Sequence, residues 1–184
     1  HNHSGRPSVM VLRPADADET TAAWKMAMAH LYTPTALILS RQDVASVPNT
    51  SAEGVKKGAY IVSKDENPQV VMIASGSEVS TLMAGAELLR AEGVRLQIVS
   101  VPSEAIFRQQ SKEYQAEVLP QGVARFGLTA GLPCNLEGLV GEHGTVWGLN
   151  SFGFSAPYKV LDEKLGFTAE NVYNQVKNLL ASNI

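Results

Sequence analysis

One arginine stands where an α/β protein places ligand-binding groups. Arg41 follows the apolar run Ala36–Ser40, which is typical of a strand buried on both faces. Open α/β sheets bind ligands at the carboxyl ends of their strands. A guanidinium there can hold a phosphate through paired, charge-assisted hydrogen bonds. Judged from spacing alone, a surface arginine or an ion pair with Asp43 is the more frequent arrangement.

The turn Ser75-Gly76-Ser77-Glu78 joins a predicted strand to a predicted helix. Free amides at a helix start can bind an anion, but one glycine is a much weaker signal than a glycine-rich phosphate loop. Glu78 also puts negative charge beside any phosphate. The pattern therefore favours a structural turn, in which Gly76 adopts an unusual backbone conformation and Ser77 caps the helix.

The other reactive side chains form no recognisable catalytic pattern. Glu142 and His143 lie between glycines, which indicates a loop tip. The sequence shows no base that would activate the thiol of Cys134, so we expect an inert cysteine. One cysteine and four histidines also give no zinc pattern, and we assign no chemistry to His1 and His3.

The clearest structural pattern is a strand–helix–strand unit between Val70 and Pro102. Val70–Ala74 and Leu96–Val101 are short apolar runs, and Gly93 suits the end of the helix between them. That helix carries an apolar stripe at helical spacing, formed by Val79, Leu82, Met83, Ala86 and Leu89. Two strands joined in this way run parallel with a right-handed crossover.

A similar unit precedes it. Strands are predicted at Ser8–Leu12 and Ala36–Ser40, with a helix from Ala17 to Tyr32 between them, for which Asp16 is the N-cap and Glu19 its capping-box partner. The apolar stripe of this helix is Thr20, Trp24, Ala27, Met28 and Leu31, and we expect both Trp24 and Trp147 in the core. Two strands cannot bury both of their faces, so the unit looks like part of something longer.

Further strands are predicted at Val123–Thr129 and Thr145–Leu149, each near a helical pattern. The fold class is therefore α/β, with a small, mostly parallel mixed sheet flanked by helices and preceded by a partial α/β unit. The turn-rich residues 45–68 read as a linker that holds a short edge strand, Gly58–Val62. The expected division is 1–44, 45–68 and 69–184.

Composition excludes several classes of function. The net charge of -3 argues against nucleic-acid and anionic-membrane surfaces, which need a basic excess. No apolar run approaches the ~20 residues that span a bilayer. A single cysteine and the lack of a signal peptide before the first strand predict a reducing cytoplasm.

Ordered sequence blocks resemble the transketolase family over nearly the whole stretch from Ser8 to Leu180. Each block is modest alone, but the ordered set is specific. The blocks are Val11-Leu12-Arg13-Pro14-Ala15-Asp16, Leu39-Ser40-Arg41-Gln42, Gly54-Val55-Lys56-Lys57-Gly58-Ala59-Tyr60, Ala74-Ser75-Gly76-Ser77-Glu78-Val79, Val99-Ser100-Val101-Pro102-Ser103, Phe152-Gly153, Ser155-Ala156-Pro157 and Phe167-Thr168.

The resemblance implies a thiamine-diphosphate enzyme of the pentose phosphate pathway that moves a two-carbon ketol unit between sugar phosphates. It implies a homodimer and a divalent metal, Mg or Ca. Residues 1–44 would then end the pyrimidine-binding domain, 45–68 would link the domains, and 69–184 would form the C-terminal domain. On this view the chain holds no catalytic, cofactor-binding or metal-binding residue and is inactive alone, and Arg41 binds the substrate phosphate.

Two stretches depart from the family pattern. Thr129-Ala130-Gly131 stands where relatives usually have a glutamate followed by Ala-Gly, and Asn135 to Gly141 replaces an aromatic stretch. These departures fall outside the catalytic assignment. An alternative function stays open, in which the chain is a free-standing α/β module for dimerisation or for binding a small anion.

Overall fold

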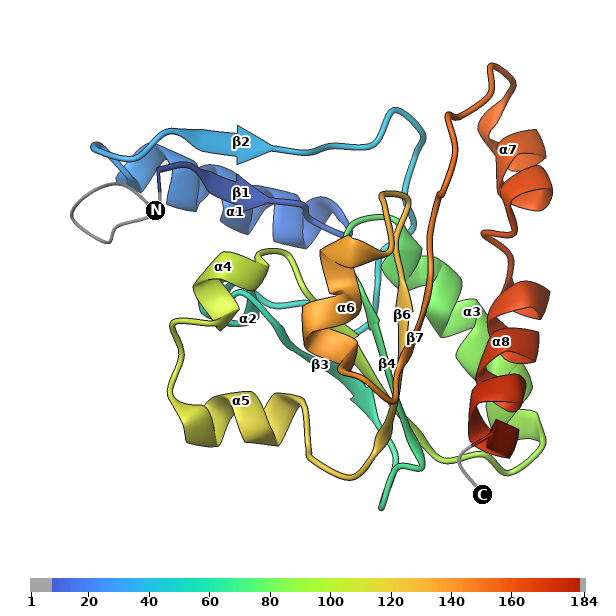
Figure 1. The fold of residues 1–184 in the computed structure, drawn as a ribbon. Coiled ribbons are helices and arrows are strands. Elements are labelled where there is room, and N and C mark those ends of the chain that lie inside the picture. Colours follow the sequence, from blue (N-terminus) through green and yellow to red (C-terminus); the bar gives the residue numbers. More distant parts are fainter. Residues whose placement is uncertain (1–7, 183–184) are drawn as a thin grey trace.

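The computed structural model describes residues 8–182, so His1 and His3 lie outside the described residues (Figure 1). The chain forms a five-stranded sheet and a separate two-stranded sheet. The strands are β1 (Met10–Leu12), β2 (Thr35–Leu37), β3 (Tyr60–Lys64), β4 (Val70–Ala74), β5 (Leu96–Ser100), β6 (Ala124–Leu128) and β7 (Thr145–Trp147). The helices are α1 (Ala17–Ala29), α2 (Ala52–Lys57), α3 (Glu78–Ala91), α4 (Glu104–Phe107), α5 (Lys112–Val118), α6 (Cys134–Val140), α7 (Tyr158–Leu165) and α8 (Ala169–Ser182).

The larger sheet has the strand order β3-β5-β4-β6-β7. Neighbouring strands from β5 to β7 pair in parallel, and only β3 is antiparallel, at the edge beside β5. The predicted mostly parallel mixed sheet is thus confirmed, and its four parallel strands lie where the apolar runs indicated. The edge strand predicted at Gly58–Val62 forms at Tyr60–Lys64 and is hydrogen-bonded into this sheet.

Helices cover both faces of this sheet, which explains why all five residues of β4 are apolar and buried. Val70, Met72 and Ala74 pack in one core with α3 and α8, whereas Val71 and Ile73 face a second core with α4, α5 and α6. Figure 1 shows α3 and α8 side by side on one face and the three short helices on the other.

The two-stranded unit, β1-α1-β2, lies across the carboxyl ends of the parallel strands of the larger sheet (Figure 1). Its strands pair in parallel, as predicted. Buried acidic residues at the start of α1 hold it there. Asp16 caps the helix by accepting from the Glu19 amide at 2.9 Å, and its other oxygen accepts from the Val47 amide at 3.0 Å and the Thr50 hydroxyl at 2.9 Å.

Glu19 does more than the predicted capping box. Its carboxylate accepts from the Ala15 amide at 2.7 Å, one residue before the expected partner. It also accepts from the Tyr60 hydroxyl at 2.7 Å and the Ser100 hydroxyl at 2.6 Å, on β3 and β5. A capping residue of α1 is therefore hydrogen-bonded to two strands of the larger sheet.

Several expectations for the first unit are wrong. The helix ends at Ala29 rather than Tyr32, and the second strand covers only Thr35–Leu37 and is half-buried. Trp24, expected in the core, is 52% exposed, and the other large members of its stripe, Met28 and Leu31, are also exposed. A single helix and a two-stranded sheet can each bury only the face that they turn toward one another. The periodic stripe on α1 therefore marks an apolar surface that this chain leaves exposed.

The unit β1-α1-β2 should exchange its amide hydrogens faster than the larger sheet. The Ile38 amide, directly after β2, donates to the Leu12 carbonyl of β1 at 2.9 Å at the end of a two-stranded sheet, whereas Met72 is fully buried at the centre of five strands. Native-state hydrogen exchange by NMR measures both. Slower exchange at Ile38 and along α1 than at Met72 would contradict this prediction.

Candidate functional site

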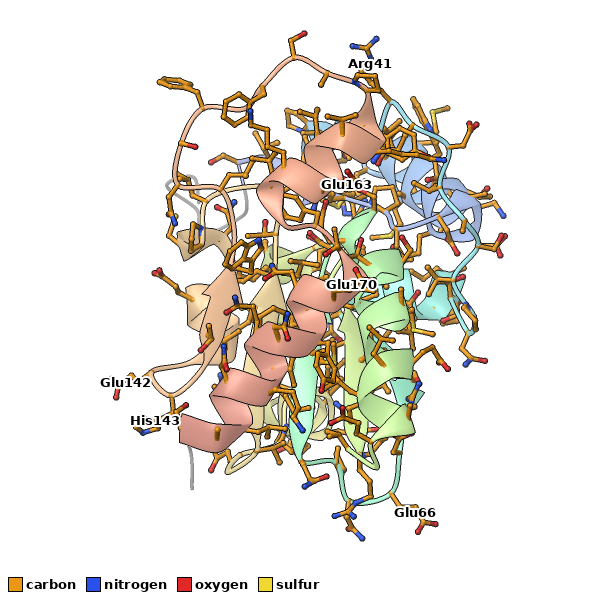
Figure 2. The ribbon with its side chains drawn as sticks, turned by 90° about the vertical axis from the view of Figure 1, so that its right-hand side faces the viewer. Arg41, Glu66, Glu142, His143, Glu163 and Glu170 are labelled. Carbon is orange, nitrogen blue, oxygen red and sulfur yellow. The ribbon has the colours of Figure 1, made fainter. Side chains whose placement is uncertain are left out.

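Arg41 lies at the rim of a cavity of about 850 Å³ at the carboxyl ends of the strands. The segment Ile38–Gln42 forms one wall, and the start of α3 and helix α7 form the other. Arg41 does not directly follow its strand as predicted, because β2 already ends at Leu37. An extended segment carries it outward instead, and its side chain is exposed at one end of the molecule (Figure 2).

The Arg41 guanidinium has no hydrogen bond or ion pair with any other residue in 8–182. Spacing alone favoured a surface arginine or an ion pair with Asp43; the side chain is exposed, and the ion pair is not formed. All donors of this guanidinium are therefore available to an external anion. A guanidinium carries its charge at any physiological pH and matches phosphate oxygens in geometry.

The opposite wall of the cavity carries acidic groups, Glu78 at the start of α3 and Asp162 on α7. Burial, with a smaller contribution from the Glu78 charge, raises the pKa of Asp162. The Glu78 carboxylate forms an ion pair with Arg13, which also lines this cavity, so Asp162 is the acidic group of that wall that has no cationic partner among residues 8–182.

The turn Ser75-Gly76-Ser77-Glu78 is structural, as predicted, because Arg13 occupies it. The Arg13 guanidinium donates to the Ser75 carbonyl at 2.6 Å and forms an ion pair with Glu78, whose side chain is only 7% exposed. Gly76 has a φ of +67°, and a Cβ there would lie 2.8 Å from the Arg13 Cζ. The predicted cap is wrong, since Ser77 is already helical and its side chain makes no capping bond.

The remaining candidates lie apart from Arg41. Glu142 and His143 form an exposed turn at the far end of the molecule, as the loop-tip interpretation expected (Figure 2). Trp147 is half-buried against the core and donates to the Leu165 carbonyl at 3.1 Å. Cys134 is an exposed free thiol at the start of α6.

Within residues 8–182, no group of three or more His, Cys, Asp or Glu side chains could hold a metal ion. No helix in the same range is long and apolar enough to cross a membrane.

Comparison with known proteins decides the family. The model of the transketolase-like TK C-terminal domain matches residues 58–168. The chain belongs to this family. It is 42% identical over 180 residues to a transketolase of Geobacillus stearothermophilus. A solved transketolase of Leishmania mexicana superimposes with a TM-score of 0.90 at 38% identity over 96% of this chain.

The match covers only part of these relatives. The chain spans 27% of the Geobacillus transketolase and 26% of the Leishmania chain. A solved split-gene transketolase, an inactive beta4 tetramer, matches with a TM-score of 0.75 and 25% identity, and here the chain spans 59% of the other chain. The recognised resemblance and the α/β fold are therefore confirmed, whereas Arg41 was found from sequence and its role stays a prediction.

Removing Arg13 should destabilise the protein more than removing an exposed partner. Arg13→Met leaves the nearly buried Glu78 carboxylate unpaired, and we expect a loss of about 2–3 kcal/mol in the free energy of unfolding. The double variant Arg13→Met/Glu78→Gln should recover about half of that loss, because no buried charge is left without a partner. Urea denaturation measures all three proteins.

Lys56→Met is the matched control. Its partner Glu53 is 79% exposed, so the change should alter stability far less than Arg13→Met does. Equal losses for Arg13→Met and Lys56→Met would show that the pair with Glu78 does not hold the turn.

Proposed function

We propose that this chain acts as the C-terminal part of a transketolase, which transfers a two-carbon ketol unit between sugar phosphates. Membership of the C-terminal-domain family supports this proposal, as does a match to two transketolases over 94% and 95% of the chain at 40% and 42% identity. In this assignment residues 1–44 end the pyrimidine-binding domain, 45–68 form the linker and 69–184 form the C-terminal domain. We also propose that the complete protein acts in the cytoplasm as a homodimer.

The single observation that carries a substrate role is the free guanidinium of Arg41 at the rim of its cavity. In the complete enzyme Arg41 binds the terminal phosphate of the sugar. The free guanidinium favours the anionic end of the substrate, because no other residue in 8–182 competes for its hydrogen-bond donors. Arg41 would thus position the substrate, and the reacting carbonyl would lie away from it.

The described residues do not fit the cofactor itself. A thiamine diphosphate site needs a divalent metal held by oxygen ligands, and residues 8–182 offer no cluster of three potential acidic or histidine ligands. We therefore assign thiamine diphosphate and its Mg or Ca ion to a part of the enzyme outside this chain. The exposed apolar side chains of α1, Trp24 and Met28, are a surface on which such a part could pack.

One observation favours an alternative. A split-gene transketolase exists as a solved chain of which this one spans 59%, and that chain is described as an inactive tetramer. This chain could likewise serve as a separate subunit or as a free-standing module for dimerisation or for a small anion. The length of the native reading frame separates this arrangement from a C-terminal part of one long polypeptide.

Arg41→Ala in the complete enzyme should raise KM for phosphorylated acceptors by about ten- to a hundred-fold, the value of a charge-assisted hydrogen bond. The phosphate is remote from the reaction, so kcat should change little. For unphosphorylated acceptors KM should stay nearly constant. Arg41→Lys keeps the charge but loses the paired geometry, and should give an intermediate KM.

Arg95→Ala is the matched control, because Arg95 is also exposed but precedes β5. It therefore lies at the amino-terminal end of that strand, away from the carboxyl ends where Arg41 lies. It should leave both KM values unchanged. If Arg41→Ala impairs phosphorylated and unphosphorylated acceptors equally, Arg41 is structural and its assignment is wrong.

The 184-residue chain alone should bind no thiamine diphosphate and show no transketolase activity. Isothermal titration with the cofactor and magnesium should give no heat of binding, since the metal-held diphosphate needs ligands from elsewhere. Binding in the micromolar range would place the cofactor site on this chain and overturn the division of roles.

A further inference from the structure

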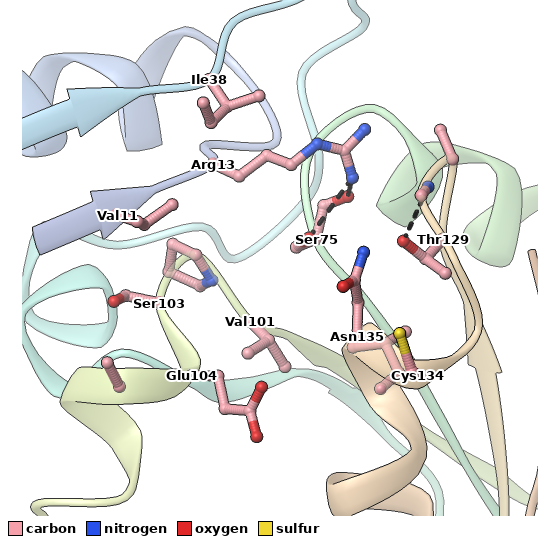
Figure 3. Close-up of a pocket in the computed structure, with 15 residues that line it drawn as sticks. Val11, Arg13, Ile38, Ser75, Val101, Ser103, Glu104, Thr129, Cys134 and Asn135 are labelled. Carbon is pink, nitrogen blue, oxygen red and sulfur yellow. Dashed lines mark hydrogen bonds between the residues drawn. The ribbon is translucent and has the colours of Figure 1, made fainter. Parts of the chain in front are cut away.

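A second cavity, of about 750 Å³, lies on the other side of Arg13 (Figure 3). Val11 and Ile38 of the first unit form its upper wall. The segments that follow β4, β5 and β6 form the rest, with Ser75, Glu104 and Asn135 among their side chains.

Its position is one where α/β sheets bind ligands. The chain leaves β4 toward α3 on one face of the sheet, whereas it leaves β5 and β6 toward α4 and α6 on the opposite face (Figure 1). The loops therefore diverge at the carboxyl end of β4 and open a crevice there. Such points of divergence are the usual ligand sites of open α/β sheets.

The uncharged polar groups of the cavity can each donate and accept. The side-chain amide of Asn135 has no hydrogen-bond partner in 8–182 and points toward Ser75 (Figure 3). The Thr129 hydroxyl accepts from the Gly131 amide at 3.1 Å and keeps its own proton to donate. The Ser75 hydroxyl accepts a 3.3 Å bond from Arg13 and likewise keeps a proton. Ligand hydroxyl groups match such mixed partners.

Among the described residues that line the cavity, the two charged ones already have partners of opposite charge. Arg13 is paired with Glu78, and Glu104 is paired with Arg108 at 2.5 Å. A phosphate or an ammonium group would find no uncompensated countercharge, so its desolvation would not be offset. None of the described residues lining the cavity is aromatic, so it offers no platform for stacking a base.

We propose that this cavity binds a small uncharged polyol or unphosphorylated sugar. Its hydroxyl groups bond to Asn135, Thr129 and Ser75, and its carbon skeleton lies against Val11, Ile38 and Val101. Both stretches where the sequence departs from the transketolase pattern contribute to this lining, through Thr129–Gly131 and Asn135–Leu136. Arg41 does not line this cavity, so the proposed site is separate from the Arg41 site. The proposal does not depend on the transketolase activity.

The single cysteine of the chain reports on this cavity, because Cys134 is exposed and lies in its lining. The experiment measures the rate at which a chromogenic disulfide reagent modifies Cys134, with glycerol, xylitol or ribose as probe. We expect at least one probe to slow the reaction about ten-fold at saturation, with an apparent Kd on the order of 1 mM, as a few hydrogen bonds would give.

Two variants test where the protection arises. Asn135→Leu removes the free amide and should weaken the apparent Kd about ten-fold. Ala105→Phe, at an exposed position of the same lining, should fill the cavity and abolish protection. Asn178→Leu is the matched control, since this asparagine is exposed on α8 outside the cavity. In this variant the probe should protect Cys134 as strongly as it does in the unchanged protein. Circular dichroism verifies that each variant is folded.

Ribose 5-phosphate separates the two cavities. It should protect Cys134 far less than ribose does, because no described residue of this cavity is an unpaired cation, whereas the Arg41 site favours the phosphate. Protection by no probe, equal protection by ribose and its phosphate, or undiminished protection in Asn135→Leu would each overturn the proposal. Failure of the Arg41 assignment would leave these rates unchanged.

Discussion

The arrangement of this molecule depends on one buried carboxylate. Glu19 is fully buried, and it accepts hydrogen bonds from Ala15, Tyr60 and Ser100. Burial raises the pKa of Glu19, while the bonds from Ser100, Tyr60 and Ala15 oppose that rise. Each of these donors therefore offsets part of the desolvation of the carboxylate. Since two of them belong to the larger sheet, satisfying this one group fixes how β1-α1-β2 sits on it.

That placement creates both cavities. The first unit meets the larger sheet at the carboxyl ends of its strands, where the Arg13 amide donates to the Pro102 carbonyl at 2.8 Å. The guanidinium of the same residue fills the turn before α3 and neutralises Glu78. Arg13 thus lines both cavities, with Arg41 at the rim of one and Asn135 in the other. Neither cavity has both of its walls within a single unit.

Short-range patterns predicted the elements of the larger sheet well. Val70–Ala74 is a strand with the predicted bounds, because a short apolar run between turn residues is typical of a strand buried on both faces at the centre of a sheet. A glycine was equally informative, since Gly93 follows the end of α3 with a φ of +79°. These signals are local, and tertiary structure agrees with them.

The failures have a different cause. The stripe containing Trp24 has the period of a packed helix, but periodicity shows which face is apolar and not what covers it. Glu19 was recognised only as a capping residue, because its bonds to Tyr60 and Ser100 cross distances in sequence that no local pattern records. For the same reason, no sequence pattern indicated that Arg13 lines both cavities. Sequence reasoning found Arg41 through its neighbours in the chain, whereas Asn135 needed the structure.

Charge pairing then divides the two cavities by the ligands that they can accept. In one, Arg41 is unpaired and solvent-exposed, so an anion gains a countercharge without displacing an existing partner. In the other, Arg13 and Glu104 are each compensated, so a charged ligand would have to compete with Glu78 or Arg108. Both cavities open at the same edge of the sheet and share the side chain of Arg13. The pairing of their arginines, more than their shape or position, therefore distinguishes the two cavities: Arg41 has no partner among residues 8–182, whereas Arg13 is held by Glu78.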